Sequence, residues 1–262
     1  MDAPALQLRG ASKRFGAVQA LEGVDLDVYP GEVVALVGDN GAGKSTLIKG
    51  IAGVQPFDHG EIRIADAPVR ISTPQQATAY GIATVYQDLA LSDNLDVVAN
   101  LFLGHEPLRL RRLDEISMEK RAHTLLAELS VRIPSVRTKV ASLSGGQRQS
   151  VAIARSLIGQ PKVVLLDEPT AALGVAQTAQ VLQLVSRLRE QGLAVILISH
   201  NLADVFAVSD RIEVLRLGRN GGSFRTGEAR NEDVVAAITG ASEERLGQAL
   251  AEAQAEHAGG GE

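Results

Sequence analysis

The chain has 262 residues, 45% of them hydrophobic, and a formal net charge of −5 from 26 Lys and Arg against 31 Asp and Glu. This length allows one large globular domain, or one domain with a small subdomain, and the mild acidity disfavours a basic module that binds nucleic acid. Zero cysteines exclude disulfides and thiolate catalysis, and without a run of roughly 18 apolar residues or a signal peptide we expect a cytosolic chain.

The first thirty residues alternate between apolar and polar positions. Val24, Leu26 and Val28 are separated by aspartates, and Pro30 ends the region. An alternation with a period of two is typical of strands that are buried on one face only. We therefore expect an antiparallel β region at the N-terminus.

Three later segments are continuously apolar: residues 33–37, 163–166 and 194–198. Such runs are typical of strands that are buried on both faces of a parallel sheet. Segments with helical spacing precede the second and the third run. The pattern predicts an α/β fold with a mostly parallel core sheet.

Between about residues 88 and 159 the chain is helical in pattern and richer in charge, and residues 118–129 have apolar positions three and four apart. We expect a helical subdomain inserted in the α/β core. Arg109, Arg111 and Arg112 lie in this region, and we interpret them as a solvated face. Residues 241–262 are rich in Ala and Glu, so we expect a short exposed helix and a partly disordered tail.

Residues 38–45 match the phosphate-binding pattern G-x-x-x-x-G-K-[ST], between a buried strand and a helical segment. A glycine-rich turn is the alternative, but this context favours a nucleotide. Lys44 would reach the β and γ phosphates, and the Ser45 hydroxyl would ligate Mg²⁺. The phosphate loop, residues 38–46, consists of Gly38, Asp39, Asn40, Gly41, Ala42, Gly43, Lys44, Ser45 and Thr46.

The apolar run 163–166 delivers two carboxylates, Asp167 and Glu168, to the end of a strand, where parallel sheets bind ligands. Asp167 is placed to hold Mg²⁺, directly or through water. Glu168 is the candidate base that polarises the attacking water. Strands often end in acidic loop residues, so the pair by itself is weak, but with the phosphate loop it predicts an NTPase.

The sequence L-S-G-G-Q at residues 143–147 precedes a segment of helical spacing at 148–158. A serine and two glycines at a helix N-terminus can bind an anion. One interpretation is a serine N-cap with a flexible turn. The other is a loop that covers the γ-phosphate of a nucleotide held by a second subunit. This signature loop, residues 144–147, consists of Ser144, Gly145, Gly146 and Gln147.

The motifs G-x-x-G-x-G-K-S-T, L-S-G-G-Q and V-V-L-L-D-E-P-T follow in that order, and the chain resembles the nucleotide-binding subunit of an ABC (ATP-binding cassette) transporter over about residues 5–240. The resemblance implies a P-loop NTPase cassette over residues 1–240 that binds ATP and Mg²⁺. It implies that Phe15 stacks on adenine, that Gln87 contacts Mg²⁺ and links the site to a membrane partner, and that His200 contacts the γ-phosphate. A plain core or surface phenylalanine and a structural histidine are the alternatives.

The sequences of residues 86–91, 100–106 and 170–174 resemble those of the monosaccharide-importer branch of that family, and the chain is similar to its single-cassette members. The resemblance implies a homodimer or cassette pair that ATP closes, and integral-membrane permease subunits that receive the motion. It implies a periplasmic or lipid-anchored sugar-binding protein as an indirect partner, and a peripheral position on the inner face of the membrane.

One residue departs from the family pattern, and the motifs are also compatible with two other functions. Gly174 stands where many members of the family have an aspartate, which puts the coupling between the two sites of a dimer in question. An ATPase of a non-sugar ABC transporter, and an ABC ATPase that acts on a macromolecular assembly, are the alternative functions.

Overall fold

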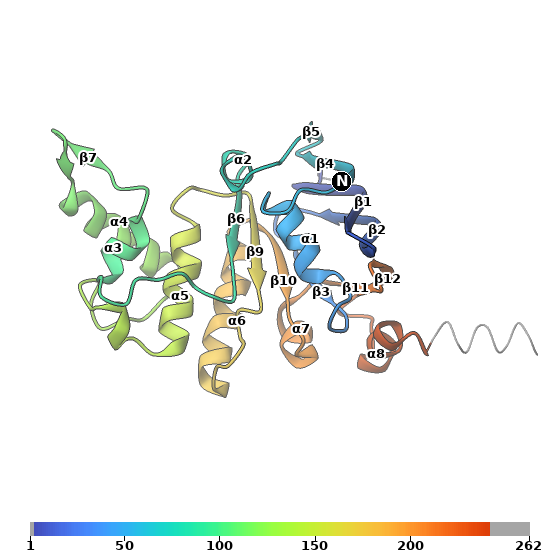
Figure 1. Ribbon diagram of the computed structural model, residues 1–262. Helices are drawn as coiled ribbons and strands as arrows, with labels where there is room; N and C mark the ends of the chain where they lie inside the picture. The colour runs from blue at the N-terminus through green and yellow to red at the C-terminus, as the bar shows by residue number, and fades with distance from the viewer. Residues whose placement is uncertain (1–2, 242–262) are drawn as a thin grey trace, which may run out of the picture.

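The computed structural model of the chain describes residues 3–241, so the expected tail lies, apart from its first residue, outside the described residues. Figure 1 shows a central sheet, an antiparallel sheet at the N-terminal side and a helical lobe on the opposite side. No helix within residues 3–241 is long and apolar enough to cross a membrane.

The N-terminal sheet is antiparallel, as the alternating pattern predicts. Val24, Leu26 and Val28 are buried and Asp25 is exposed, so the strand presents one face to the core. In spatial order the strands are β2 (Val18–Val28), β1 (Leu6–Phe15), β4 (His59–Ile64) and β5 (Ala67–Val69).

The central sheet is parallel except for one edge strand. Three of its four inner strands are the three continuous apolar runs of the sequence, and the strands on either side of those three were not predicted. In spatial order the sheet contains β12 (Arg219–Arg225), β11 (Arg211–Arg216), β3 (Val33–Val37), β10 (Ala194–Ile198), β9 (Val163–Asp167) and β6 (Ile82–Val85).

Both faces of this sheet are covered by apolar side chains, as parallel sheets require. Along β3, Val34 and Leu36 join the core that contains α1 (Lys44–Ile51), while Val33 joins the core of the helical lobe. Further helices pack around the sheet: α2 (Pro74–Ala79), α6 (Val175–Glu190), α7 (Leu202–Val208) and α8 (Asn231–Thr239).

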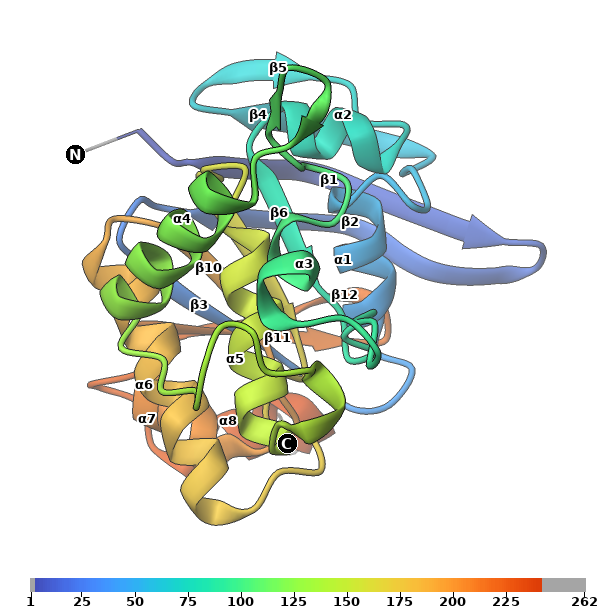
Figure 2. The ribbon, with the colours of Figure 1, turned by 90° about the vertical axis from the view of Figure 1, so that its left-hand side faces the viewer.

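The helical lobe contains α3 (Val97–Phe102), α4 (Glu115–Glu128), the short 3₁₀ turn Val140–Ser142 and α5 (Gly145–Ser156), and Figure 2 shows it in front of the central sheet. The buried residues of α4 are Met118, Ala122 and Leu126, a stripe at helical spacing. The same range holds a small hairpin of β7 (Leu108–Arg109) and β8 (Arg112–Leu113), which the sequence did not predict.

The strand order positions the site. Strand β10 lies between β3 and β9, and all three run in the same direction. The segments that follow their carboxyl ends therefore lie at one edge of the sheet, where ligands of open α/β folds bind.

Candidate active site

The phosphate loop connects β3 to α1 through residues in the left-handed region. Gly38 has φ 151° and Gly43 has φ 105°. A Cβ atom at Gly43 would lie 2.7 Å from Cδ2 of Leu21 and 2.8 Å from the carbonyl oxygen of Ala20, so only glycine fits. No side chain caps α1, which leaves the N–H groups of its first turn for an anion.

Lys44 closes the phosphate loop from within. Its ammonium donates to the carbonyl oxygens of Gly38, at 2.6 Å, and of Asp39, at 2.9 Å. Burial lowers the pKa of Lys44, and the charges of Glu168, Asp39 and Asp167 oppose that shift. The ammonium is thus within electrostatic reach of both carboxylates that follow β9.

The two carboxylates differ in their surroundings. Burial raises the pKa of Asp167, the charge of Glu168 raises it further, and Lys49 and Lys44 lower it. Glu168 has a left-handed backbone, with φ 51°, and its N–H donates to the carbonyl oxygen of Ile198 at 3.1 Å. A left-handed non-glycine residue of this kind costs free energy and is found most often at functional sites.

His200 meets Glu168 directly. Nδ1 of His200 and Oε2 of Glu168 are hydrogen-bonded at 2.6 Å, and the side chains are 69% and 23% exposed. His200 is the second residue after the end of β10, so the strand order brings together two residues that are 32 positions apart. The exposure excludes a core histidine, and the pair forms a carboxylate with an oriented imidazole beside it.

The residues expected to hold Mg²⁺ are Ser45, Gln87 and Asp167, and all three offer oxygen ligands, which Mg²⁺ prefers. Ser45 and Gln87 are exposed, and Asp167 is half-buried with a raised pKa. No group of three His, Cys, Asp or Glu side chains in residues 3–241 could hold a metal alone. This donor set fits a Mg²⁺ ion that arrives with phosphates, because such ions use only one or two carboxylates.

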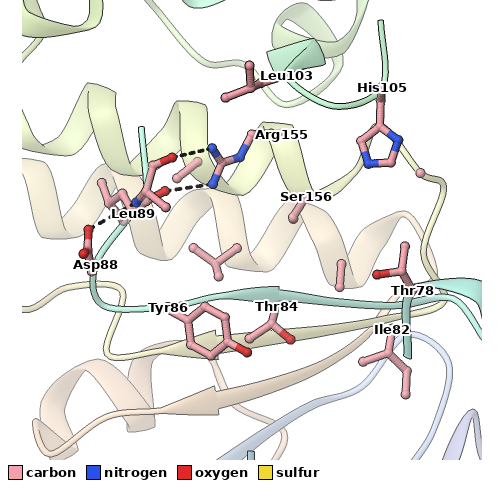
Figure 3. A pocket seen from close by; sticks show the side chains of 15 residues that line it. Thr78, Ile82, Thr84, Tyr86, Asp88, Leu89, Leu103, His105, Arg155 and Ser156 are labelled. Atoms are coloured by element: carbon pink, nitrogen blue, oxygen red, sulfur yellow. Dashed lines mark hydrogen bonds between the residues drawn. The ribbon is translucent and has the colours of Figure 1, made fainter. Parts of the chain in front are cut away.

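The loop after β6, which carries Gln87, is held by a residue that the sequence analysis missed. Arg155, in the last turn of α5, donates from Nη1 to the carbonyl oxygen of Ala90 and from Nη2 to that of Leu89, both at 2.8 Å (Figure 3). Burial lowers the pKa of Arg155. An arginine near the end of an amphipathic helix forms no motif, so its role is visible only in the structure.

A cavity of about 240 Å³ lies beside this loop, between β6, α5 and the segment after α3 (Figure 3). Thr84 and Tyr86 line it from the sheet, and Leu103 and His105 line it from the helical lobe. Burial raises the pKa of Tyr86, and the charge of Asp167 adds to that shift. The cavity therefore opens between the helical lobe and the strand whose loop carries Gln87.

The signature loop begins α5 with a complete capping box. Ser144 Oγ accepts from the N–H of Gln147 at 3.3 Å, and Gln147 Oε1 accepts from the N–H of Ser144 at 3.0 Å. No hydrogen bond or ion pair in the described part of the chain joins the signature loop to the phosphate loop. Ser144 is the serine N-cap of the first interpretation, and one chain does not bring the two loops into contact.

Two further predicted positions lie at the surface. Phe15 ends β1 with 42% of its surface exposed, and Lys13 Nζ lies 5.6 Å from its ring centroid, so Phe15 is not a core residue. Gly174 is the N-cap of α6 and makes no side-chain capping bond, where an aspartate would supply one.

The sequence has known relatives. A profile of the family described as ABC transporter matches residues 21–171. The fructose import ATP-binding protein FrcA of Rhizobium meliloti is 47% identical over 92% of this chain and 95% of that protein. The xylose/arabinose import ATP-binding protein XylG of Sulfolobus acidocaldarius is 46% identical over 82% of this chain and 85% of that protein.

Solved structures share the fold. The ADP conformation of MJ1267, an ATP-binding cassette of an ABC transporter, superposes with a TM-score of 0.76 at 26% identity, covering 90% of this chain and 95% of that one. The dimeric post-hydrolysis state of the cassette MJ0796, bound to ADP and Pi, superposes with a TM-score of 0.71 at 26% identity, covering 84% and 98%.

Proposed function

The chain belongs to the ABC transporter family and is one of its ATP-hydrolysing cassettes, and from this premise we propose that it powers the import of a monosaccharide. The identity of 47% to a fructose import ATP-binding protein, over nearly the full length of both chains, carries the proposal. A xylose/arabinose import ATP-binding protein at 46% identity supports it.

Within the site, Lys44 holds the β and γ phosphates while the free N–H groups of α1 bind them from the loop. Glu168 accepts the proton of the attacking water, which is typically worth about 10²- to 10⁴-fold in rate. His200, bonded to Glu168, contacts the γ-phosphate from the end of β10. Phe15 stacks on the adenine ring.

Ser45, Asp167 and Gln87 hold the Mg²⁺, which neutralises charge on the phosphates when it is bound. Arg155 fixes the backbone of the loop that carries Gln87 by bonding the carbonyl oxygens of Leu89 and Ala90, and we propose that this holds Gln87 ready for the Mg²⁺. The strained backbone of Glu168 and its bond to Ile198 keep the base in one position before ATP arrives.

The signature loop acts in trans, in a homodimer or in a pair with a related cassette. The absence of any hydrogen bond or ion pair between this loop and the phosphate loop within the described residues, and the dimeric state of the cassette MJ0796 with ADP and Pi, support this arrangement. ATP bound between two chains favours the closed dimer because only the closed state gives the γ-phosphate both loops. Hydrolysis removes that bias and the dimer opens.

The cavity beside the Gln87 loop is where we place the permease, at the cytoplasmic face of the membrane. A segment of the permease seated there would contact Leu103 and His105 and would move with the loop that Arg155 holds. The sugar-binding protein contacts the permease on the other side and reaches this chain only through it.

The test is a pull-down of tagged Glu168→Gln protein with ATP from mildly solubilised native membranes, with Lys44→Ala as the matched control that cannot hold ATP. We expect a polytopic permease and a sugar-binding protein with Glu168→Gln. Recovery of soluble partners alone would contradict a transporter and favour an ATPase of a macromolecular assembly. A permease with another binding protein would correct the cargo only.

A further inference from the structure

The hairpin of β7 and β8 is the most exposed apolar feature of the helical lobe, and Figure 1 shows it standing away from the body of the molecule. Leu108 is 68% exposed, Leu110 at the turn is 91% exposed and Leu113 is 54% exposed. Ile116, just beyond the hairpin, is 83% exposed. Three large apolar side chains of the hairpin, and Ile116 at the start of α4, are thus largely uncovered by the rest of residues 3–241.

The same hairpin concentrates positive charge. Leu108 pairs with Leu113 and Arg109 pairs with Arg112, so leucines and arginines lie on opposite faces. Like charges directly opposite each other destabilise a strand pair. Within residues 3–241, the side chains of Arg109, Arg111 and Arg112 make no hydrogen bond or ion pair, although the chain as a whole is acidic.

The backbone of the hairpin turn is strained, which is a third contribution that opposes folding. Leu110 has φ 54° and Arg111 has φ 63°. A two-residue hairpin turn with two positive φ values strongly favours Asn-Gly, because other residues are strained there. Exposed leucines, opposed arginines and a strained turn each oppose folding, so the hairpin is better explained by a binding surface than by a structural turn.

We propose that this hairpin docks on an anionic lipid surface, with the leucines in the apolar boundary and the arginines on the headgroup phosphates. A lipid surface needs only a few apolar side chains and unpaired cations, which are what the tip offers. The inference rests on the proposed function only for its location, since a permease would bring the chain to the membrane.

The position of the hairpin agrees with that location. Leu103 and His105 line the cavity assigned to the permease, and the hairpin follows them directly in the chain. In a chain seated on a permease through this cavity, the hairpin would begin three residues beyond the contact at His105.

The test uses the absence of tryptophan in the full-length chain. Leu110→Trp places a single fluorophore at the tip, and Leu217→Trp is the matched control. Leu217 lies between β11 and β12, is 78% exposed and also has a positive φ, of 49°, but it lies at the other end of the molecule (Figure 1). Both proteins are titrated with vesicles of phosphatidylcholine, with and without about 30% phosphatidylglycerol.

We expect a blue shift of the Leu110→Trp emission with the anionic vesicles and none with the neutral ones, and no shift for Leu217→Trp. Adding Arg109→Gln and Arg112→Gln to Leu110→Trp should lower the apparent vesicle affinity about 25-fold, about fivefold for each charge. Adding Arg70→Gln and Arg225→Gln, two exposed arginines elsewhere, should leave it nearly unchanged.

Three results would overturn the proposal: no shift of the tip tryptophan with anionic vesicles, an equal shift at Leu217, or an equal loss of affinity with the Arg70 and Arg225 pair. A fourth result would also overturn it: Arg109→Gln and Arg112→Gln leave the vesicle affinity unchanged but weaken binding to the detergent-purified permease. That result would assign the hairpin to a protein partner. The vesicles contain no permease, so failure of the lipid inference leaves the import function standing, and the reverse also holds.

Discussion

Helices α1 and α5 both begin after a glycine-containing loop of a kind that can bind an anion, but the two N-termini are capped differently. Helix α1 starts after Gly43 without any side-chain cap, so its N–H groups depend on a ligand. Helix α5 starts at Ser144 with a complete capping box, so its N-terminus is satisfied by its own chain. The N–H groups of the phosphate loop are therefore free for a ligand, whereas the signature loop has its N-terminal N–H groups capped by its own side chains, which is consistent with the proposal that it meets the nucleotide of another subunit.

The largest expected effect is that of Glu168→Gln, which should trap ATP between the phosphate loop of one chain and the signature loop of another. Glu168→Gln should keep ATP binding and lower turnover by about 10²- to 10⁴-fold, because the base is lost while the phosphate contacts remain. ATP should then produce a stable dimer, measured by size-exclusion chromatography. Glu190→Gln, at the end of α6, is the control. Unchanged hydrolysis in Glu168→Gln would mean that another group is the base.

The next prediction would break the comparison if both loops served one chain. Lys44→Ala disables the phosphate loop and Ser144→Arg disables the signature loop, and each homodimer should be inactive. A one-to-one mixture should regain about a quarter of the wild-type ATPase rate, because half of the dimers would carry one intact site. A mixture as inactive as its components, although mixed dimers form, would contradict sites shared between subunits.

A smaller effect concerns the link between the two regions. Arg155 stands at the far end of the helix that the signature loop begins, and it bonds the loop of Gln87. Arg155→Lys keeps the charge but cannot donate to two carbonyls in a fixed geometry, and we expect an ATPase rate about tenfold lower. A positioning role predicts a larger change in Mg²⁺ dependence than in thermal stability. Arg121→Lys, an exposed arginine of α4, is the control.

The smallest expected effect is on stability. The pKa of Asp167 is raised in the folded chain by burial and then by Glu168, so folding favours its protonated form and stability falls as the pH rises through that pKa. Asp167→Asn removes this penalty and should raise Tm by about 1–3 °C near pH 8, while activity is lost. The gain should shrink toward about pH 4. Asp93→Asn, an exposed aspartate, is the control, and an equal gain there would contradict the role of burial.

The sequence predicts the centre of the fold and misses its margins for one physical reason. Strands β3, β9 and β10 are buried on both faces, so each is a continuous apolar run. Strand β6 has only four residues and includes Ala and Thr, and β12 contains two glycines and ends in arginines, so neither has a distinctive pattern. The hairpin of β7 and β8 has two-residue strands and no Asn-Gly turn, so nothing in its sequence predicts it.

The candidate site divides in the same way. Loops whose backbone binds phosphate need fixed glycines, so residues 38–45 could be found from the sequence alone. The bond between Glu168 and His200 forms because β10 lies beside β9. The order of strands in a sheet cannot be predicted from the local sequence of each strand. Arg155 acts through backbone carbonyls of another segment, which accept from any donor of the right reach, so no residue pattern announces it.

The carbonyl bonds of Lys44 have a consequence for nucleotide exchange. When no nucleotide is bound, the ammonium of Lys44 donates to the carbonyl oxygens of Gly38 and Asp39, so it is not left without hydrogen-bond acceptors. When the next nucleotide arrives, one set of acceptors replaces another and little of the backbone has to move. The loop would then spend little of the binding free energy of a nucleotide on reorganising its own backbone.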